Sequence, residues 1–289
     1  MRALAALAVV AVVGLTAGCF DPSPAEGLLC GPGDSCPGAQ RCDRFAAVPV
    51  CRAPDSDAGV RPAPNFGAGG EPTLIAIPAG GFEMGCNKNI RSTCEDDEGP
   101  AHIVRLPAFE LTRTEITAGQ YNACVLDGAC RSPPSFDMTR ASYPVTARTF
   151  QDARDYCSWA RMRLPTEAEW EFAARGVASY EWPWGHTPTP DCDRAVMMGC
   201  GGIGPVATLP AGASPEGVMD LAGNVAEWVN DWWQPYTTER DDPRGPVYGT
   251  QRVIRGGHAS SPAADIRSAR RNKAAPEQQS TSVGFRCAR

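Results

Sequence analysis

The chain has 289 residues, with 33 acidic and 27 basic side chains, a net charge of −6 and an isoelectric point near 5.2. This balance argues against a nucleic-acid-binding protein, which would present a basic face. Hydrophobic residues make up 43% of the chain, enough for a folded core, and the 30 glycines and 27 prolines favour a loop-rich fold over a helical bundle. The 13 cysteines are an odd number and need an explanation.

The N-terminus carries the features of an export signal. Arg2 precedes an apolar run over residues 3–18, which is shorter than the roughly 20 residues of a membrane-spanning helix. The segment LTAGC that ends at Cys19 resembles a bacterial lipobox, although Thr16 stands where leucine is preferred. We therefore predict a signal peptide over residues 1–18, lipid attachment at Cys19, and a place in the bacterial cell envelope, on its periplasmic or surface face. An ordinary secretory signal with an incidental cysteine is the alternative.

Three short segments follow the signal peptide. Residues 19–29 form a polar tether, residues 30–51 contain four cysteines, and residues 52–72 are a linker rich in proline, glycine and alanine. The four-cysteine segment is too short to bury a sufficient core, so two disulfides would have to hold it, and their pairing is open. A zinc site is the alternative, but the cysteine spacing does not match paired zinc hooks. The cysteines concerned are Cys30, Cys36, Cys42 and Cys51.

Residues 73–289 form the main predicted domain. An apolar segment over residues 74–77 predicts a strand, and the glycine-rich segment GGFEMG (80–85) predicts a turn that leads into a second strand. GGFEMG lacks the features of a phosphate-binding loop. The acidic run at residues 95–98 is interpreted as a solvated loop, because it lacks the defined ligand spacing of a calcium site.

Three helices are predicted in this domain. One follows Thr117, and a second covers about residues 149–160, each with apolar residues at helical spacing. The third has the clearest local signals, because Thr166 and Glu169 form a capping box and a glycine ends the helix. Short strands, turns and aromatic residues follow to the C-terminus. A few helices among many short strands indicate a compact α+β domain.

Several segments, read in order, resemble the formylglycine-generating enzyme family, also called sulfatase-modifying factors. The most specific are RLPTEAEWE (163–171) and LAGNVAEW (221–228), and the resemblance extends over nearly all of residues 73–289. It implies a loop-rich fold related to C-type lectins, with few helices and with disulfide staples. This expectation agrees with the composition.

The resemblance also directs attention to the segment after an RGG motif, here residues 255–257. The family's oxidases use two cysteine thiolates in this segment to bind copper(I) and activate oxygen, and soft thiolates suit that ion. No cysteine lies between Cys200 and Cys287 in this chain, and the two thiol positions fall near Ser261 and Ala263. Neither side chain can replace a thiolate toward copper. Copper binding and formylglycine-generating oxidase activity are therefore not expected here.

The same segment holds the remaining candidates for chemistry. His258 lies two or three residues before Ser260 and Ser261, so a serine nucleophile beside a histidine base is a candidate arrangement. No acid partner is implied for a triad, and closeness in sequence does not set geometry. The alternative is a structural or surface histidine, since a single imidazole without identified partners makes no metal site.

A calcium ion is the cofactor that the resemblance implies, around the LAGN segment. Carried over to this sequence, its ligands are the side chain of Asp220, the carbonyls of Gly223 and Val225, and the carboxylate of Glu227. Oxygen ligands at alternating positions suit a hard cation, which would hold loops and take no part in chemistry. A tight turn held by hydrogen bonds alone is the alternative.

Disulfides are predicted for the cysteines of the main domain, because an even number remains once Cys19 carries lipid. The resemblance implies a bridge between Cys157 and Cys287, which joins a helix to the C-terminal GFRC segment. Pairing by proximity in sequence adds three short loops, Cys86–Cys94, Cys124–Cys130 and Cys192–Cys200.

Two functions remain open on the sequence alone. The first is a lipid-anchored protein without oxidase activity, whose domain binds a peptide, protein or glycan partner. The second is an enzyme of the formylglycine-generating type, or of another periplasmic oxidative modification, that uses a divergent site. The missing thiols favour the first, because chemistry depends on the residues of a site and not on the fold that carries them.

Overall fold

The computed structural model describes residues 41–43, 50–52, 63–88, 94–132, 137–237 and 240–289. The chain divides into two compact units. In the first, β1 (Arg41–Asp43) pairs antiparallel with β2 (Val50–Arg52). The predicted signal peptide, the lipidation of Cys19 and the cysteine pairing of the small module lie outside the described residues. No described helix is long and apolar enough to cross a membrane.

Three α-helices of the second unit lie where the sequence predicts them: α1 (Ala118–Leu126), α2 (Phe150–Trp159) and α3 (Glu167–Arg175). Each helix follows a threonine. The threonine side chain accepts a hydrogen bond from the backbone N–H of the third residue after it, and the side chain of that third residue accepts one from the backbone N–H of the threonine. Such a box satisfies two donors that a helix start leaves free. It fixes the first residue of helices that are too short to be stable alone.

The described strands of this unit form one four-stranded sheet and two separate pairs. The larger sheet has the order β10–β7–β8–β9, in which β10 is parallel to β7 and the other neighbours are antiparallel. Its strands are β7 (Ala226–Trp232), β8 (Arg252–Arg255), β9 (Arg271–Ala274) and β10 (Val283–Phe285). The antiparallel pairs are β3 (Leu74–Ile77) with β6 (Phe109–Thr112), and β4 (Gly80–Met84) with β5 (His102–Leu106). Short 3-10 helices lie in the connections: η2 (Gly67–Gly69), η3 (Asp96–Glu98), η4 (Met138–Arg140), η5 (Pro210–Gly212) and η6 (Ala263–Ile266).

The predictions of a strand at residues 74–77 and of a second strand after it are confirmed, but the turn placed at GGFEMG is wrong. Most of that segment is the strand β4, which pairs with β5 over its full length. A Cβ atom on Gly80 would lie 2.9 Å from the Phe172 ring of α3. Gly80 therefore allows the strand to pack closely against the helix, and it does not mark a turn of the chain.

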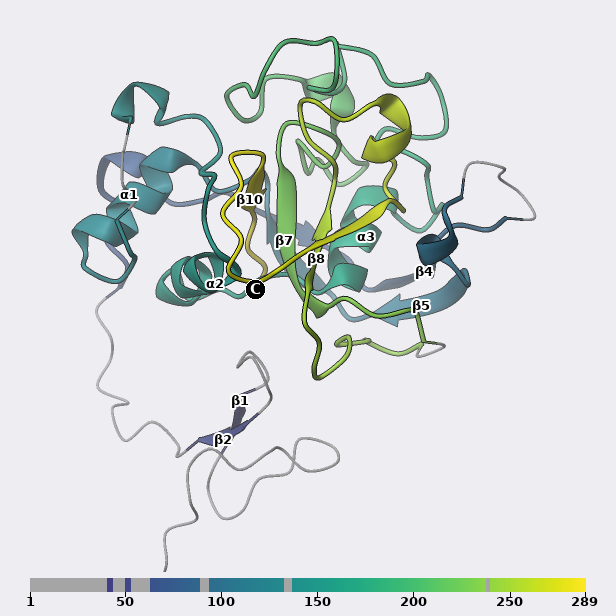
Figure 1. The fold of residues 1–289 in the computed structure, drawn as a ribbon, viewed down its shortest axis with the longest axis horizontal. Coiled ribbons are helices and arrows are strands. Elements are labelled where there is room, and N and C mark those ends of the chain that lie inside the picture. Colours follow the sequence, from purple (N-terminus) through teal and green to yellow (C-terminus); the bar gives the residue numbers. More distant parts are fainter. Residues whose placement is uncertain (1–40, 44–49, 53–62, 89–93, 133–136, 238–239) are drawn as a thin grey trace, which may run out of the picture. The chain divides into compact units, whose positions relative to one another are not determined.

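The core lies on both faces of β7. Helix α3 contacts β7 and β8 on one side and β4 and β5 on the other (Figure 1). Trp170 of this helix is buried in one cluster with Val229, whereas Trp228 belongs to a second cluster with Tyr156 of α2 and Phe285 of β10. Successive side chains of a strand point to opposite faces, so β7 separates the two clusters. The turns that enter β7 and leave β8 are thereby held in fixed positions.

Four disulfides staple the domain, and they are the four pairs predicted. Cys157 of α2 joins Cys287 next to β10, and both sulfurs are buried. This bridge links elements 130 residues apart in sequence. The other three close short loops, Cys86–Cys94, Cys124–Cys130 and Cys192–Cys200.

Candidate functional site

A polar cleft lies beside the segment that follows β8. Its cavity volume is about 280 Å³, and its walls come from β8, β9 and the chain before β10. The lining includes His258, Ser261, Asp265, Arg270, Asn272 and Gln278. Hydroxyl, amide, carboxylate and guanidinium groups thus face one space, so the cleft can offer both donors and acceptors to a ligand.

Glycine backbone shapes the wall of this cleft. Gly256 and Gly257 directly follow β8, and both have positive φ, at 92° and 68°. A Cβ atom on Gly257 would lie 2.8 Å from the carbonyl oxygen of Asp265 and from the Ile266 side chain. The sharp turn after the strand therefore needs glycine, and it brings the segment from His258 to Asp265 against the cleft.

The serine predicted near the first thiol position is held by the backbone. The Ser261 side chain, 7% exposed, accepts from the N–H of His258 at 3.1 Å. The Ser261 N–H donates to the His258 carbonyl at 2.7 Å. The His258 ring in turn accepts from the Ser260 N–H at 3.2 Å. Within the described residues no hydrogen bond joins this imidazole to a serine hydroxyl or a carboxylate, so the three residues form a tight turn and not a nucleophile–base pair.

The second thiol position is equally unsuited to soft-metal chemistry. Ala263 begins η6 directly after this turn and carries only a methyl group. Every cysteine from Cys86 to Cys287 is joined in one of the four disulfides. The described part of the domain therefore has no thiol pair that could bind copper(I) at the cleft.

The turn that precedes β7 contains the predicted calcium ligands. Gly223 has φ +83°, and a Cβ there would lie 2.2 Å from the Val196 carbonyl, so the turn requires glycine. The Gly223 N–H donates to the Gly256 carbonyl at 2.9 Å, which connects this turn to the one after β8. Asp220 also has positive φ, and its carboxylate accepts from the Ala207 N–H at 2.8 Å. Val225 is fully buried at the entry to the strand.

Glu227 of β7 lies in a buried ion pair with an arginine that the sequence did not single out. Arg286 donates from Nε to Oε2 of Glu227 at 2.6 Å and from Nη2 to Oε1 at 2.8 Å. The Trp170 indole N–H adds a third donor, to Oε2, at 2.8 Å. Burial opposes the charge on Arg286, but the Glu227 carboxylate outweighs it and raises the pKa of the guanidinium.

Glu115 is a second unforeseen residue of this region. It lies between β6 and α1, is fully buried, and accepts from the Asn224 side-chain amide at 3.1 Å. Its other carboxylate oxygen has no hydrogen-bond partner. Burial, followed by the charges of Asp220 and Glu227, raises the pKa of Glu115 well above its usual value. Burial also raises the pKa of Asp220, whose side chain contacts that of Glu115.

Comparison with known proteins assigns the domain. A family model described as sulfatase-modifying factor enzyme 1-like domain matches residues 62–289. The chain is 32% identical over 281 residues to the formylglycine-generating enzyme of Thermomonospora curvata, covering 74% of this chain and 92% of that enzyme. The chain belongs to the sulfatase-modifying factor family. Its disulfide-stapled α+β domain is thus a fold of the formylglycine-generating type, as the resemblance implied.

Solved structures agree with this fold. PvdO from Pseudomonas aeruginosa aligns with a TM-score of 0.66 at 25% identity, covering 78% of this chain and 98% of that one. The variable protein 1 of Treponema denticola aligns with a TM-score of 0.64 at 24% identity, covering 78% and 96%, which supports the fold alone.

The calcium that this family implies has a chemically suitable environment here. Asp220, Glu115 and Glu227 supply carboxylate oxygens, which hard cations prefer. One oxygen of Glu115 lacks a partner in the protein, and a buried carboxylate is stable only when it is paired. Glu227 is the least available of the three, because Arg286 and Trp170 already donate to it. These oxygens are of the kind that a divalent cation takes, but within the described residues the three carboxylates do not converge within 4.8 Å of one another.

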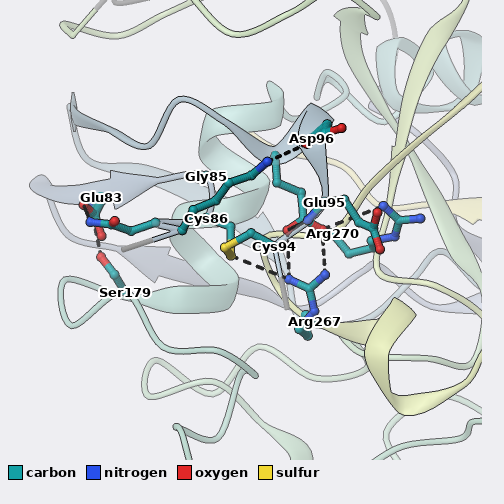
Figure 2. The surroundings of a disulfide bond; sticks show 12 residues. Glu83, Gly85, Cys86, Cys94, Glu95, Asp96, Ser179, Arg267 and Arg270 are labelled. Carbon is teal, nitrogen blue, oxygen red and sulfur yellow. Dashed lines mark hydrogen bonds and ion pairs between the residues drawn. A yellow bond between two sulfur atoms is a disulfide. The ribbon is translucent and has the colours of Figure 1, made fainter. Parts of the chain in front are cut away.

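The acidic run of this sulfatase-modifying factor domain differs from the prediction of a solvated loop. Glu98 is fully buried, and Arg267 donates to both of its oxygens, at 2.9 and 2.8 Å. Figure 2 shows Arg267 directly beside the Cys86–Cys94 disulfide, to whose Cys86 sulfur it also donates. The run therefore anchors the disulfide loop to the segment after η6, and only part of it faces solvent.

A second cavity of about 280 Å³ lies near the start of α3 and was not foreseen from sequence. Asp231 of β7 lines it and accepts from the Glu167 N–H at 2.7 Å. Burial and the neighbouring Glu167 carboxylate raise the pKa of Asp231 to about 7. The apolar part of its wall includes Tyr236 and Tyr248. Asp231 thus ties the first turn of α3 to the sheet.

Proposed function

We propose that this protein is a cell-envelope lipoprotein whose sulfatase-modifying factor domain binds a peptide, protein or glycan partner in the polar cleft and is not a copper oxidase. The observation that carries this proposal is the absence of cysteine between Cys200 and Cys287, the part of the chain where the family's oxidases carry both thiols. Copper(I) needs soft ligands, and a serine hydroxyl that accepts a backbone hydrogen bond is a poor substitute.

The cleft itself supports a binding role. Asn272 and Gln278 offer amide groups, and Asp265 pairs with Arg270 at 3.2 Å beside them. Such groups can satisfy the amides of an extended peptide or the hydroxyls of a glycan. A lipid on Cys19 and the part of the predicted linker that precedes the matched domain at residue 62 would hold the domain at a membrane while leaving it free to reach a partner.

The alternative function is enzymatic, with a divergent site. It is favoured by the cavity that persists where the family's oxidases carry their thiols, and by relatives named as enzymes, such as the hercynine oxygenase of Mycolicibacterium smegmatis at 29% identity. An oxidase of this kind would need a redox group that the residues around His258 do not supply.

Calcium at the turn before β7 is part of the same proposal. Asp220, the carbonyls of Gly223 and Val225, and Glu227 would hold the ion. It would fix this turn against the turn after β8, because Gly223 already bonds to Gly256. Its role would be to shape one wall of the cleft and not to take part in a reaction.

A variant that fills the cleft tests the binding role. Asn272 is exposed and lines the cleft, so Asn272→Trp should block it without disturbing the core. Labelled wild-type chain and both variants are applied to peptide and glycan arrays. Glu277→Trp is the control, because Glu277 is also exposed but does not line the cleft. We expect hits whose binding falls at least about tenfold in Asn272→Trp and is unchanged in Glu277→Trp. Hits that bind equally to both variants would contradict a site in the cleft.

A further inference from the structure

We infer that the cavity near the start of α3 binds a basic side chain, lysine or arginine, of a partner polypeptide, and that Asp231 is the counter-charge at its base. This site is separate from the polar cleft, because the two cavities share no lining residue. Most of its wall comes from the connection between β7 and β8. Its volume of about 280 Å³ is at the lower end of the range for ligand pockets, so it suits one long side chain.

The wall of this cavity is apolar from the mouth inward. Pro243, Pro246, Val247 and Tyr248 of the connection all line it. Val247 is 54% exposed and Tyr248 is 69% exposed, so the apolar surface continues to the solvent, whereas Asp231 is only 5% exposed. Lysine and arginine side chains have an apolar stem and a charged end. They therefore match a cavity with apolar walls and a carboxylate at its buried end.

The Asp231 carboxylate has no cation beside it. Its Oδ2 atom accepts from the Glu167 N–H at 2.7 Å, and among the described residues no ion pair joins it to a basic side chain. Gly245 has φ +71°, and a Cβ atom there would lie 2.1 Å from Oδ1 of Asp231. Glycine at this position therefore allows the carboxylate to lie in the wall of the cavity.

The arginines nearby are already paired with another acid. Arg271 lines the cavity, but it donates to both oxygens of Glu167, at 2.7 and 2.8 Å, and its guanidinium lies 3.9 Å from the centre of the Tyr236 ring. Arg255 also donates to Glu167, at 3.2 Å. Burial and the Glu167 carboxylate raise the pKa of Asp231 to about 7. A cationic ligand would supply the missing charge and form a charge-assisted hydrogen bond.

Blocked tripeptides test this inference on the purified full chain. Each has glycine on both sides of arginine, lysine, norleucine or glutamate, and n-butylguanidinium is the free cation. Ligand-observed NMR titrations at pH 8, above the pKa of Asp231, give the dissociation constants. We expect the arginine or lysine peptide to bind at least about tenfold more tightly than the norleucine peptide, which has the apolar stem without the charge. The glutamate peptide should not bind.

Two variants locate the binding in this cavity. Asp231→Asn keeps an oxygen that can accept from the Glu167 N–H but removes the charge, so it should weaken binding of the basic peptide at least about tenfold. Asp241→Asn is the control, because the Asp241 side chain is 81% exposed in the same connection and does not line the cavity. Val247→Lys places a cation at the mouth and should also prevent binding, whereas Val247→Gln should have a much smaller effect. This pair carries the test if Asp231→Asn fails to fold.

The outcomes separate this site from the cleft and from free cations. Affinity lost in Asp231→Asn or Val247→Lys and kept in Asp241→Asn supports the inference, whether or not the cleft binds a ligand. Equal affinity for the norleucine and basic peptides, or binding unchanged in both cavity variants, would overturn it. Binding of n-butylguanidinium without binding of either basic peptide would overturn a polypeptide as the source of the cation.

Discussion

Replacement of Arg286 with methionine should destabilise the domain by about 3–5 kcal/mol, because it leaves a buried carboxylate without its cation. Arg286 is fully buried and provides both charged hydrogen bonds to Glu227. It also donates to the carbonyls of Thr112 and Met219, which would lose a partner as well. Urea unfolding of wild type and Arg286→Met, followed by tryptophan fluorescence, measures the difference.

Two variants control this result. Arg289→Met removes an arginine whose side chain is 57% exposed and pairs with Glu110, so its cost should stay below about 1 kcal/mol. The double variant Glu227→Leu, Arg286→Met should be more stable than Arg286→Met alone, since the unpaired charge is then removed too. Equal unfolding midpoints for Arg286→Met and the wild type would show that the pair does not hold the C-terminal strand in place.

Loss of the bridge between Cys157 and Cys287 is expected to cost about 4–5 kcal/mol, because this disulfide closes a loop with a sequence separation of 130. The bridge ties α2 to the end of β10, which pairs with β7. The double variant Cys157→Ala, Cys287→Ala should therefore unfold at a clearly lower urea concentration. Calorimetry and urea titration both measure the loss.

The bridge between Cys192 and Cys200 offers a matched control. It has a sequence separation of 8, and Cys192 is exposed, so its removal should cost only about 2–3 kcal/mol in the same chain-entropy model. The chemistry of the two substitutions is identical, and only loop length and burial differ. A larger loss from the short loop than from the long one would refute the ranking.

Local signals allowed much of the fold to be predicted. The third helix start was predicted from its capping box, which is complete within four residues, and the first two helices from apolar residues at helical spacing; in the structure all three begin with such a box. The three short disulfides follow from closeness along the chain. The long bridge needed the resemblance, because nothing local links Cys157 to Cys287.

The charged interior could not be predicted in this way. Glu98 belongs to an acidic run of the kind that usually faces solvent, and its burial depends on Arg267, 169 residues away. Glu115 and Arg286 carry no local signal either, because their partners Asn224 and Glu227 come from other elements. The available hints were their places in the chain. Glu115 lies between a strand and a helix, and Arg286 belongs to the GFRC segment. Ion pairs between residues far apart in sequence can be identified only once the fold that brings the two elements together is known.

One feature of the cleft could be predicted from the sequence, and another needed the structure. The absence of cysteine between Cys200 and Cys287 is a sequence fact and already argued against copper. The structure adds that the Ser261 hydroxyl accepts from the His258 backbone N–H and that Nδ1 of His258 accepts from the Ser260 N–H, so the ring and this hydroxyl are not paired with each other. What remains at the cleft is a set of hydrogen-bonding groups.

Copper(I) titration of the purified wild-type chain tests the central claim most directly. The variant Ser261→Cys, Ala263→Cys, which restores the two thiols, is titrated in parallel. We expect no stoichiometric copper binding and no oxygen consumption by the wild type with a cysteine-containing sulfatase-type peptide, because the chain lacks soft ligands at the cleft. One copper ion bound per wild-type chain, together with oxygen uptake in the presence of that peptide, would contradict a binding role without oxidase activity.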